Sequence, residues 1–522
     1  MVLSTIAALF IPLCWILASV ACRSMTGANL HRLHRITNIA SLMALAGAIA
    51  AVAALVTSGP ATIAIAGLPS WVPSLRIDAV SVTMVAIVTI VGVVVVRYSL
   101  AYLAGDEGQR RFFAYLSETL AAVLLLVLAG NLLVFLAAWV IMSLSLHRLL
   151  EFYPERPRAL LAARKKFVAA RASDIVLLMA VLQLAHTTGT WEIAALASAA
   201  AALPAEAMTA PALLLALAAL LKSAQFPLHS WLTEVMESPT PVSALLHAGI
   251  VNAGGFLLVR FSDVLVISSV SMYLLLIVGG ITAIFGSLVM LTQRSIKGAL
   301  AYSTIAQMGF MVLQCGLGAF SSAMLHIAAH SLYKAHAFLA SGSIVDVARG
   351  AGFRDGDEVP GPVIVTVSAV VTGAVVVGWG VVFGATVASK PAILGLGAVL
   401  AFGALHLVIQ SSLGQSKVVQ ALRAFLTANV VAFLYFLFQL GAAWVFADAV
   451  PASGSLDVVQ QALMVLMLVS FGAVTLLQWY LPVLQKQPRW QALWVHLSNG
   501  FYLNQMLNQI MAAPRRGARD LQ

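Results

Sequence analysis

Charged residues are scarce in this sequence. Asp, Glu, Lys and Arg account for 9% of its 522 residues, while 61% are hydrophobic. Because a soluble domain carries about 25% charged residues, this chain has too few to cover a soluble surface. The composition excludes soluble enzymes and binding modules and predicts a polytopic membrane protein.

Cysteines and nucleotide-binding loops are scarce too. The three cysteines, Cys14, Cys22 and Cys315, form no CxxC pair, which argues against a disulfide framework and against a zinc or iron–sulfur site. The sequence contains no glycine-rich nucleotide loop, so an ATPase or an NADH-binding role has no basis in it. We therefore expect no metal and no other cofactor in this chain.

Apolar runs, in contrast, are abundant. Roughly fifteen of them reach the length of about 18 residues that a membrane-spanning helix needs. They lie near residues 2–22, 36–57, 77–101, 112–129, 131–150, 168–187, 207–232, 241–261, 270–291, 299–318, 320–347, 361–385, 391–411, 424–447 and 459–481. A shorter apolar stretch at 191–203 predicts a surface helix, and 489–512 predicts one amphipathic interfacial helix. The expected fold is an all-α polytopic membrane protein of about 14–15 transmembrane helices.

The basic residues lie in alternate loops. If the N-terminus is outside, the cytoplasmic loops and tail contain most of them, and the other side has only Arg76, Arg260 and Lys390. The cytoplasmic set comprises Arg23, Arg32, Arg35, Arg110, Arg111, the segment 148–171, Arg294, Lys297, Arg349, Arg354, Lys417, Arg423, Lys486, Arg489, Arg515, Arg516 and Arg519. This pattern is typical of a multi-pass protein with its C-terminus in the cytoplasm. The net charge of +10 therefore reflects topology and predicts no nucleic-acid partner.

One lysine stands deep inside an apolar run. Lys222, in APALLLALAALLKSAQFPLHSWL, lies well within the predicted span 207–232. A lysine in hydrocarbon costs several kcal/mol, and ionisable residues at such positions usually mark an ion or proton path. Pro227 follows it and breaks the helix, which is tolerated at membrane depth only beside protein or a water-filled cavity. The alternative is a lysine whose ammonium extends to the membrane interface.

A second break and a histidine follow. Pro239 and Pro241 interrupt the chain in ESPTPVSALLHAG, which ends next to His247. Near neutral pH a histidine can pass a proton between its two ring nitrogens. We interpret His247 as a relay partner of Lys222, and the alternative is a histidine satisfied within the core.

Three more titratable residues follow one another at helical spacing. His326, His330 and Lys334 fall at i, i+4 and i+8 in MLHIAAHSLYKAHAFL, so they share one helix face. We interpret them as a ladder of proton-carrying groups along a span. The HxxxH spacing also suits a metal, but the intervening residues lack the glutamate of a zincin.

Two acids complete the set. Asp174 enters the predicted span 168–187 three residues after Arg171, and Glu118 lies inside the predicted span 112–129. Asp174 could pair with a buried lysine or only with Arg171 at the membrane edge. Glu118 could serve the path or extend to the interface. Together with Lys222, His247 and the ladder, both acids form the predicted proton or cation pathway.

These motifs resemble a known family. The segment KSAQFPLHSWLTEVMESPTPVSALLHAG, residues 222–249, is similar to the signature of the antiporter-like subunits of respiratory complex I and of Mrp-type cation/proton antiporters. The motifs RFFAYL, NLLVFLAAW, SIKGALAYSTIAQMGF and HIAAHSLYKAHAFLASGS match in the family's order, over about residues 75–350. The resemblance implies two inverted five-helix repeats, each with a broken helix, around a hydrophilic axis that conducts protons. It also implies that Lys222 is the central lysine, His247 its relay partner and Asp174 the sixth-span acid.

The resemblance implies a division of the chain. Residues 1–75 would be N-terminal transmembrane helices, 76–350 the antiporter-like core, 351–485 C-terminal transmembrane helices and 486–522 a cytoplasmic amphipathic tail. The ladder of His326, His330 and Lys334 would form the second half-channel of the core.

One departure from the family affects the central lysine. The family's fifth span reads W-E-G-x-G, and its glutamate pairs with that lysine. Here Trp139 is followed by Val140. Glu118, on the neighbouring span, is a candidate replacement. The departure argues against an ordinary complex I subunit.

A second resemblance narrows the function. WVIMSLSLHRLLEFYPERP, ARKKFVAARASD and HAGIVNAGGFLLVRF look like the membrane subunits of DAB inorganic-carbon accumulation complexes. This implies a bacterial inner-membrane subunit that carries protons or Na+ down their gradient. Its partner would be a large cytoplasmic subunit resembling a zinc β-carbonic anhydrase, which hydrates CO2 to bicarbonate, so zinc is expected there. The alternatives are an Mrp-type antiporter, a proton-pumping subunit of an NADH- or ferredoxin-driven complex, and a scaffold that transports nothing.

Overall fold

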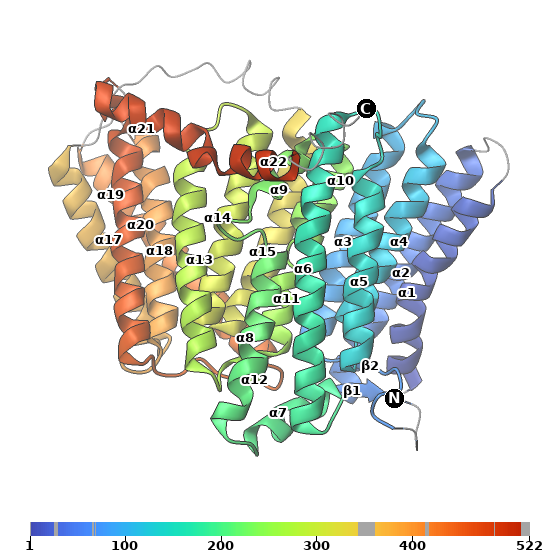
Figure 1. Cartoon of the computed structure of the whole chain (residues 1–522). Helices are drawn as coiled ribbons and strands as arrows, with labels where there is room; N and C mark the ends of the chain where they lie inside the picture. The colour runs from blue at the N-terminus through green and yellow to red at the C-terminus, as the bar shows by residue number, and fades with distance from the viewer. Residues whose placement is uncertain are drawn as a thin grey trace.

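The structure is a computed structural model, helical almost throughout (Figure 1). It describes residues 2–25, 30–64, 67, 69–342, 361–412, 417–484 and 486–512. In Figure 1 the N-terminus and the β1–β2 hairpin lie at the lower edge, and we call this side the hairpin face. The opposite side is called the basic face, because α1 ends there at Arg23.

The first part of the chain is a bundle of long helices. Its elements are α1 (Val2–Ser24), α2 (Leu30–Ser58), β1 (Ala61–Ile63), β2 (Leu75–Ile77), α3 (Ala79–Tyr102), α4 (Gln109–Val127), α5 (Leu132–Leu150) and α6 (Pro157–Thr188). The two strands pair antiparallel, with Thr62 opposite Arg76. The predicted surface helix at 191–203 is present as α7 (Ile193–Ala201), on the hairpin face.

The middle of the chain contains the two predicted breaks. α8 (Ala205–Lys222) ends at the lysine, and α9 (Ser230–Glu234) with η1 (Val235–Glu237) follows after a non-helical stretch that contains Pro227. Next come α10 (Thr240–Leu245), the π-helical turn η2 (Leu246–Ile250), α11 (Ala253–Arg260) and α12 (Ser262–Leu265). Pro239 and Pro241 stand at the start of α10, where a proline's missing N–H costs no helical hydrogen bond.

The remaining helices complete the molecule. They are α13 (Ser269–Met290), α14 (Ile296–Gly316), α15 (Phe320–Leu339), η3 (Ala340–Gly342), α17 (Pro362–Val382), α18 (Pro391–Ser412), α19 (Lys417–Val445), α20 (Val458–Leu484), α21 (Pro488–Ser498), η4 (Gly500–Tyr502) and α22 (Leu503–Ala512). Glycines let α13 and α14 approach closely: a Cβ added at Gly309 would lie 2.5 Å from the nitrogen of Ala283. Small residues at such seams are typical of helix pairs in membranes.

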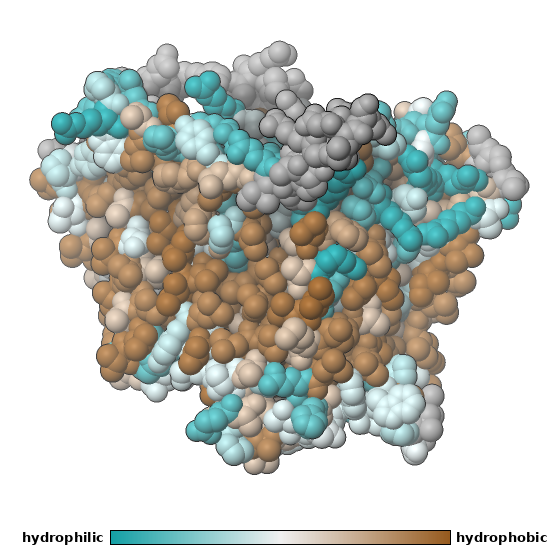
Figure 2. Space-filling model, viewed as in Figure 1, coloured by the Kyte–Doolittle hydropathy of each residue, from teal (hydrophilic) through white to brown (hydrophobic). Residues whose placement is uncertain are grey.

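Each predicted span corresponds to helical structure, and the one at 207–232 is interrupted after Lys222. Twelve of the described helices are long and apolar enough to cross a membrane. α4, α15 and α18 run alongside them and account for the other predicted spans (Figure 1). Figure 2 shows a hydrophobic band around the middle of the molecule, with hydrophilic residues gathered above and below it. The chain is an all-α polytopic membrane protein.

The C-terminal part of the chain differs from its predicted structure in one respect, and part of it lies outside the described residues. The interfacial helix predicted at 489–512 is instead two helices, because the backbone turns left-handed at Phe501 (φ 54°) between α21 and α22. The predicted domain boundary at 350, and the loop with Arg349 and Arg354, lie outside the described residues, as does the tail after 512. The division into four regions stays a prediction.

Candidate functional site: a buried line of titratable groups

The break after Lys222 is held by packing from two other helices. A Cβ added at Gly254 of α11 would lie 2.6 Å from the carbonyl oxygen of Ala219, so α11 packs directly against the end of α8. The Phe226 N–H, which the break removes from any helix, donates to Thr282 Oγ1 of α13 at 3.0 Å. Non-helical backbone at membrane depth requires partners of this kind.

Lys222 is buried beside an acid and an aromatic ring. Its ammonium lies 4.0 Å from Asp174 Oδ1 on α6 and 4.4 Å from the ring centroid of Trp139 on α5. Only 5% of its side chain is exposed, and among the described residues its Nζ has no hydrogen-bond partner. The position contradicts the alternative of a lysine that extends to the interface.

Asp174 lies beside both of its possible partners, Arg171 and Lys222. Its Oδ2 lies 2.5 Å from Arg171 Nη2, one turn earlier on α6, while its Oδ1 faces Lys222. Lys222 therefore has a carboxylate neighbour on α6, although Val140 of α5 provides none. The Trp139 ring adds a second attraction, because the face of an aromatic ring attracts the Lys222 ammonium.

Glu118 lies elsewhere. Its carboxylate forms ion pairs with Arg23 of α1 and with Arg148 of α5, the second at 3.0 Å. A quarter of its side chain is exposed, and both arginines are about half exposed. The structure thus does not bring Glu118 to Lys222, and its charge is balanced at the basic face.

Sequence reasoning missed a second buried lysine near the first. Lys166 is 4% exposed, and its ammonium donates to the carbonyl oxygen and hydroxyl of Ser143 at 2.8 and 3.2 Å. It is close enough to Lys222 and Asp174 to interact with both electrostatically. The signal is its position eight residues before Asp174, about two helical turns away. The charge pattern instead predicts a cytoplasmic loop over 148–171, whereas α6 begins at Pro157.

A small cavity lies between the two lysines and the η2 turn. It has a volume of about 10 Å³ and is lined by Lys166, Lys222 and the η2 residues Leu246 and Ile250, among others. This volume is near the minimum that a single water molecule needs. The cavity separates Lys222 from the turn that carries His247.

His247 lies at the π-turn η2 and is fully buried. Its Nδ1 is 2.9 Å from Thr304 Oγ1 of α14, and its ring stacks on Phe338 of α15 at 4.3 Å between centroids. Its Nε2 has no partner among the described residues. One ring nitrogen is therefore fixed by Thr304, and none of the described residues bonds the other.

The predicted ladder lies on α15 beside His247. Lys334 is completely buried and donates to the Leu300 carbonyl at 3.0 Å, and the rings of His326 and His330 are 5.9 Å apart. His330 is close enough to His247, His326 and Lys334 to interact electrostatically with all three. Two clusters result: Asp174, Lys166 and Lys222 on one side of η2, and His247 with the ladder on the other.

The tail closes over the end of the broken helix on the basic face. Glu234 of α9 accepts from Asn504 and Asn508 of α22 at 2.8 and 3.2 Å. Lys165, adjacent to Lys166, lies 2.8 Å from the same carboxylate. α22 is thereby attached to the helix segment that follows the break.

A separate buried ion-pair group lies at the hairpin face. Asp78 caps α3 and binds Arg260 through both carboxylate oxygens, at 2.5 and 3.2 Å, and Arg76 at 2.6 Å. Burial opposes ionisation of Asp78, but the two guanidinium charges and their hydrogen bonds outweigh it and hold the pKa of Asp78 well below its usual range. Two of the three basic residues of this face are thus neutralised.

The described residues contain no cluster of three His, Cys, Asp or Glu side chains placed to hold a metal ion. His326 and His330 are neighbours without a third ligand. The expectation that cofactor chemistry belongs to a partner stays a prediction.

Comparison with known proteins places this architecture in a family. The domain family described as "NADH:quinone oxidoreductase/Mrp antiporter, TM" matches residues 129–354, and "NADH-Ubiquinone oxidoreductase (complex I), chain 5 N-terminus" matches 70–113. The "Probable inorganic carbon transporter subunit DabB2" of Halothiobacillus neapolitanus is 37% identical over 451 residues, which are 85% of this chain and 81% of that protein. This chain belongs to the antiporter-like membrane subunits. The resemblance over residues 75–350 is thereby confirmed.

Other relatives of this antiporter-like subunit match over a shorter region. The "Probable inorganic carbon transporter subunit DabB" of Hydrogenovibrio crunogenus is 48% identical over 274 residues, 52% of this chain and 53% of that protein. The "NADH-quinone oxidoreductase subunit L" of Mycobacterium tuberculosis is 38% identical over 287 residues, 53% of this chain and 45% of that protein. With these two relatives the chain shares about half of their length.

Two solved structures share the fold. The Mrp complex from Dietzia sp. matches 99% of this chain and 60% of the other, with a TM-score of 0.61 and 21% identity. The membrane-bound sulfane sulfur reductase, an archaeal respiratory complex, matches 92% of this chain and 95% of the other, with a TM-score of 0.56 and 19% identity. At these identities the likeness establishes the fold alone.

Proposed function

We propose that this chain is the membrane subunit of an inorganic-carbon accumulation complex. In this role it conducts protons or Na+ down their gradient and thereby energises a partner subunit that hydrates CO2. The observation that carries the proposal is the buried ion pair of Lys222 and Asp174 at a helix break, in a chain that aligns with most of a DabB2 protein. A membrane anchor alone would have no use for such a pair, because buried charges are costly to keep.

The geometry supports a stepwise relay. A proton leaving Lys222 removes the charge that attracts the Asp174 carboxylate. His247 can take part in the same transfer, because none of the described residues bonds its Nε2 and because His330 lies close to it. Lys334 lies near His330 as well. Each charge that crosses the membrane provides about 2.3 kcal/mol per 100 mV. That energy can bias the conformation that the partner recognises.

The orientation and the partner belong to the same proposal. We place the N-terminus outside and the basic face in the cytoplasm of a bacterial inner membrane, following the distribution of Lys and Arg. The partner is a large cytoplasmic subunit with a zinc site resembling that of a β-carbonic anhydrase. It would bind at the basic face, where α21 and α22 lie (Figure 1).

A complementation experiment tests the proposal. The chain and a neighbouring gene for a large zinc subunit are expressed in a host that lacks carbonic anhydrase, which then grows at ambient CO2. The Lys222→Ala variant is expected to abolish growth, while Glu118→Gln, a change in an ion pair away from the path, supports it. Growth supported equally by Lys222→Ala would refute the role of the lysine. Growth without any partner would refute the division of labour.

A second function is favoured by a different observation. The matched domain family spans complex I and Mrp antiporter subunits, and the chain is 38% identical to a complex I subunit over half of its length. A Na+/H+ antiporter subunit would produce salt-dependent pH changes in vesicles that also contain Mrp-type neighbours. A proton-pumping subunit of a dehydrogenase would co-purify with flavin and iron–sulfur proteins.

A further inference from the structure

One basic residue of the hairpin face has no acidic partner among the described residues. Arg76 and Arg260 are paired with Asp78, whereas the ammonium of Lys390 forms neither an ion pair nor a hydrogen bond with any described residue. Lys390 directly precedes α18 and is partly buried. Because an unpaired charge is costly to bury, this position favours a ligand of negative charge.

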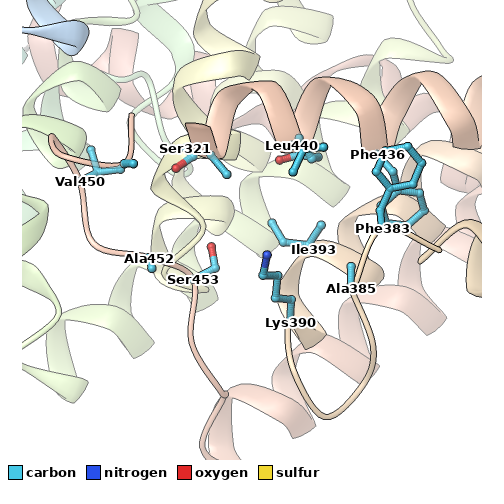
Figure 3. A pocket seen from close by; sticks show the side chains of 13 residues that line it. Ser321, Phe383, Ala385, Lys390, Ile393, Phe436, Leu440, Val450, Ala452 and Ser453 are labelled. Carbon is cyan, nitrogen blue, oxygen red and sulfur yellow. The ribbon is translucent and has the colours of Figure 1, made fainter. Parts of the chain in front are cut away.

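Lys390 lies at a cavity where α15 and α18 begin. The cavity has a volume of about 190 Å³, and Figure 3 shows the Lys390 ammonium directed into it, on the side where Ser453 lies. The Ser453 hydroxyl makes only a long contact, 3.4 Å, with the carbonyl oxygen of Gly318. None of the described lining residues is Asp or Glu, and none belongs to the predicted pathway. Asp448, just after α19, is exposed and is not part of the lining. The N-termini of two helices therefore add to the positive charge of the lysine, and such ends attract anions.

Hydrogen-bond donors also lie around this cavity. Gln439 of α19 lines it and is 8% exposed; its Oε1 accepts from Ser322 at 2.6 Å, but its amide nitrogen donates to none of the described residues. At the start of α15 no side chain caps the helix, and the N–H groups of its first three residues, 320–322, have no acceptor among the described residues. Ser321, in this first turn, lines the cavity as well. Since buried donors normally have an acceptor, this region favours a ligand that accepts hydrogen bonds.

One side of the cavity is apolar. It is lined by Phe383, Ile393, Phe436 and Leu440, among others. Leu440 belongs to α19 and is 53% exposed, so this side opens toward the lipid. A small free anion leaves these side chains uncovered, whereas a phospholipid places an acyl chain next to its charged phosphate and covers them.

We propose that this cavity binds a singly charged oxyanion, which pairs with Lys390 and accepts hydrogen bonds from Ser321, Ser453 and Gln439. One lysine balances one negative charge, and donors from four separate segments require a ligand with several acceptor atoms. The cavity is also far larger than a water molecule or a monatomic ion requires. The oxyanion can be the phosphate of a phospholipid headgroup or a free ion such as bicarbonate, and the apolar side favours the headgroup. The site does not depend on the proposed function.

Thermal unfolding with added ligands tests the site. The full chain is purified in the assembly in which it occurs and is washed with detergent to remove bound lipid. Three additives are then titrated: dihexanoyl phosphatidylglycerol, the uncharged dihexanoylglycerol with the same chains, and sodium bicarbonate against sodium chloride at equal concentration and pH. A ligand that binds only the folded protein raises Tm as its concentration rises. We expect the charged lipid to raise Tm and the uncharged one to leave it unchanged.

Variants of the lining connect this response to the cavity. Lys390→Gln is expected to raise the half-effective concentration of the charged lipid at least about tenfold, because it removes a hydrogen bond between charged groups. Lys390→Arg keeps the charge and should keep most of the response. Ser321→Ala removes a neutral donor and should weaken the response by roughly two- to tenfold. Arg294→Gln, which removes an exposed cation from the connection between α13 and α14, is the control and should respond like wild type.

The outcomes identify the source of the oxyanion or overturn the site. A response to the charged lipid that requires Lys390 supports a headgroup site. A response to bicarbonate beyond that to chloride, again dependent on Lys390, supports the same site with a free ion as its ligand. Equal responses to both lipids, an unchanged response in Lys390→Gln, or no response to any additive overturns the proposal. Transport plays no part in this measurement, so its result stands whether or not the proposed function is correct.

Discussion

Lys222 and Asp174 form a buried ion pair across α8 and α6, with 4.0 Å between Nζ and Oδ1. The pair lies at the C-terminal end of α8. The charge of Lys222 is therefore balanced by an acid on a different helix, α6. The resemblance leads to the expectation of a glutamate after Trp139, but this chain has Val140 there. Asp174 is therefore the acid whose removal should matter most.

We expect Asp174→Asn to slow gradient-driven transport by roughly 5- to 30-fold. The change leaves Lys222 without its counter-charge, and a loss of one to two kcal/mol in one relay step corresponds to this factor. Initial rates of proton uptake into vesicles that contain the complex measure the effect. A rate equal to wild type would contradict a role of the Lys222–Asp174 pair in transport.

Glu118→Gln should behave differently. Its carboxylate pairs with two half-exposed arginines, and exposed pairs contribute about 0–1 kcal/mol. We expect transport within about twofold of wild type and a small decrease in thermal stability. The same vesicle assay checks the prediction. A loss of transport as large as that of Asp174→Asn would restore Glu118 as the substitute for the missing fifth-span acid.

Asp78→Asn should destabilise the fold and change its acid sensitivity. Removing one partner of a buried pair costs about 3–5 kcal/mol, so the melting temperature should fall clearly. Because the pKa of Asp78 is held low in the folded state, its stabilisation is complete above the unfolded-state pKa of about 3.9 and is lost as the pH falls toward the folded-state value. Wild type should thus lose stability below about pH 4, and the variant should lose less of it.

Thermal unfolding in detergent at pH 7 and at pH 3 measures this difference. Glu206→Gln, an exposed acid in the first turn of α8, is the matched control and should behave like wild type. Equal melting temperatures for Asp78→Asn and wild type at pH 7 would contradict the structural role of the pair.

Asn504→Ala combined with Asn508→Ala should release α22 from α9. Both amides donate to Glu234, and each such hydrogen bond to a charged group contributes about 1.5–3 kcal/mol. We expect faster proteolysis of the C-terminal segment after η4, measured in membranes by limited digestion. Gln491→Ala on α21, which leaves the contacts of α22 with Glu234 in place, is the control. Unchanged protection would mean that α22 is held by its apolar contacts alone.

Much of the fold could be predicted from the sequence, because apolar length is a strong signal in membranes. The predicted helix breaks also coincide with Pro227, Pro239 and Pro241, since proline acts locally on the backbone. The placement of Lys222 inside the bundle and the one-face spacing of His326, His330 and Lys334 followed from the same local rules.

What could not be predicted depends on contacts between distant segments. Lys166 was assigned to a loop, because two adjacent lysines are normally solvated; only the position of Ser143 on α5 shows how it is buried. Glu118 was a candidate partner for Lys222 until Arg23, 95 residues earlier in the chain, proved to be its own partner.

The most direct test compares Lys222→Arg with wild type in the purified complex, reconstituted in vesicles under an imposed proton gradient. Arginine keeps the positive charge but cannot release a proton, so it separates proton exchange from electrostatic support. We predict that wild type takes up protons and forms bicarbonate at a rate that depends on the gradient, and that Lys222→Arg does neither. Gradient-dependent proton uptake by Lys222→Arg at the wild-type rate would contradict the account.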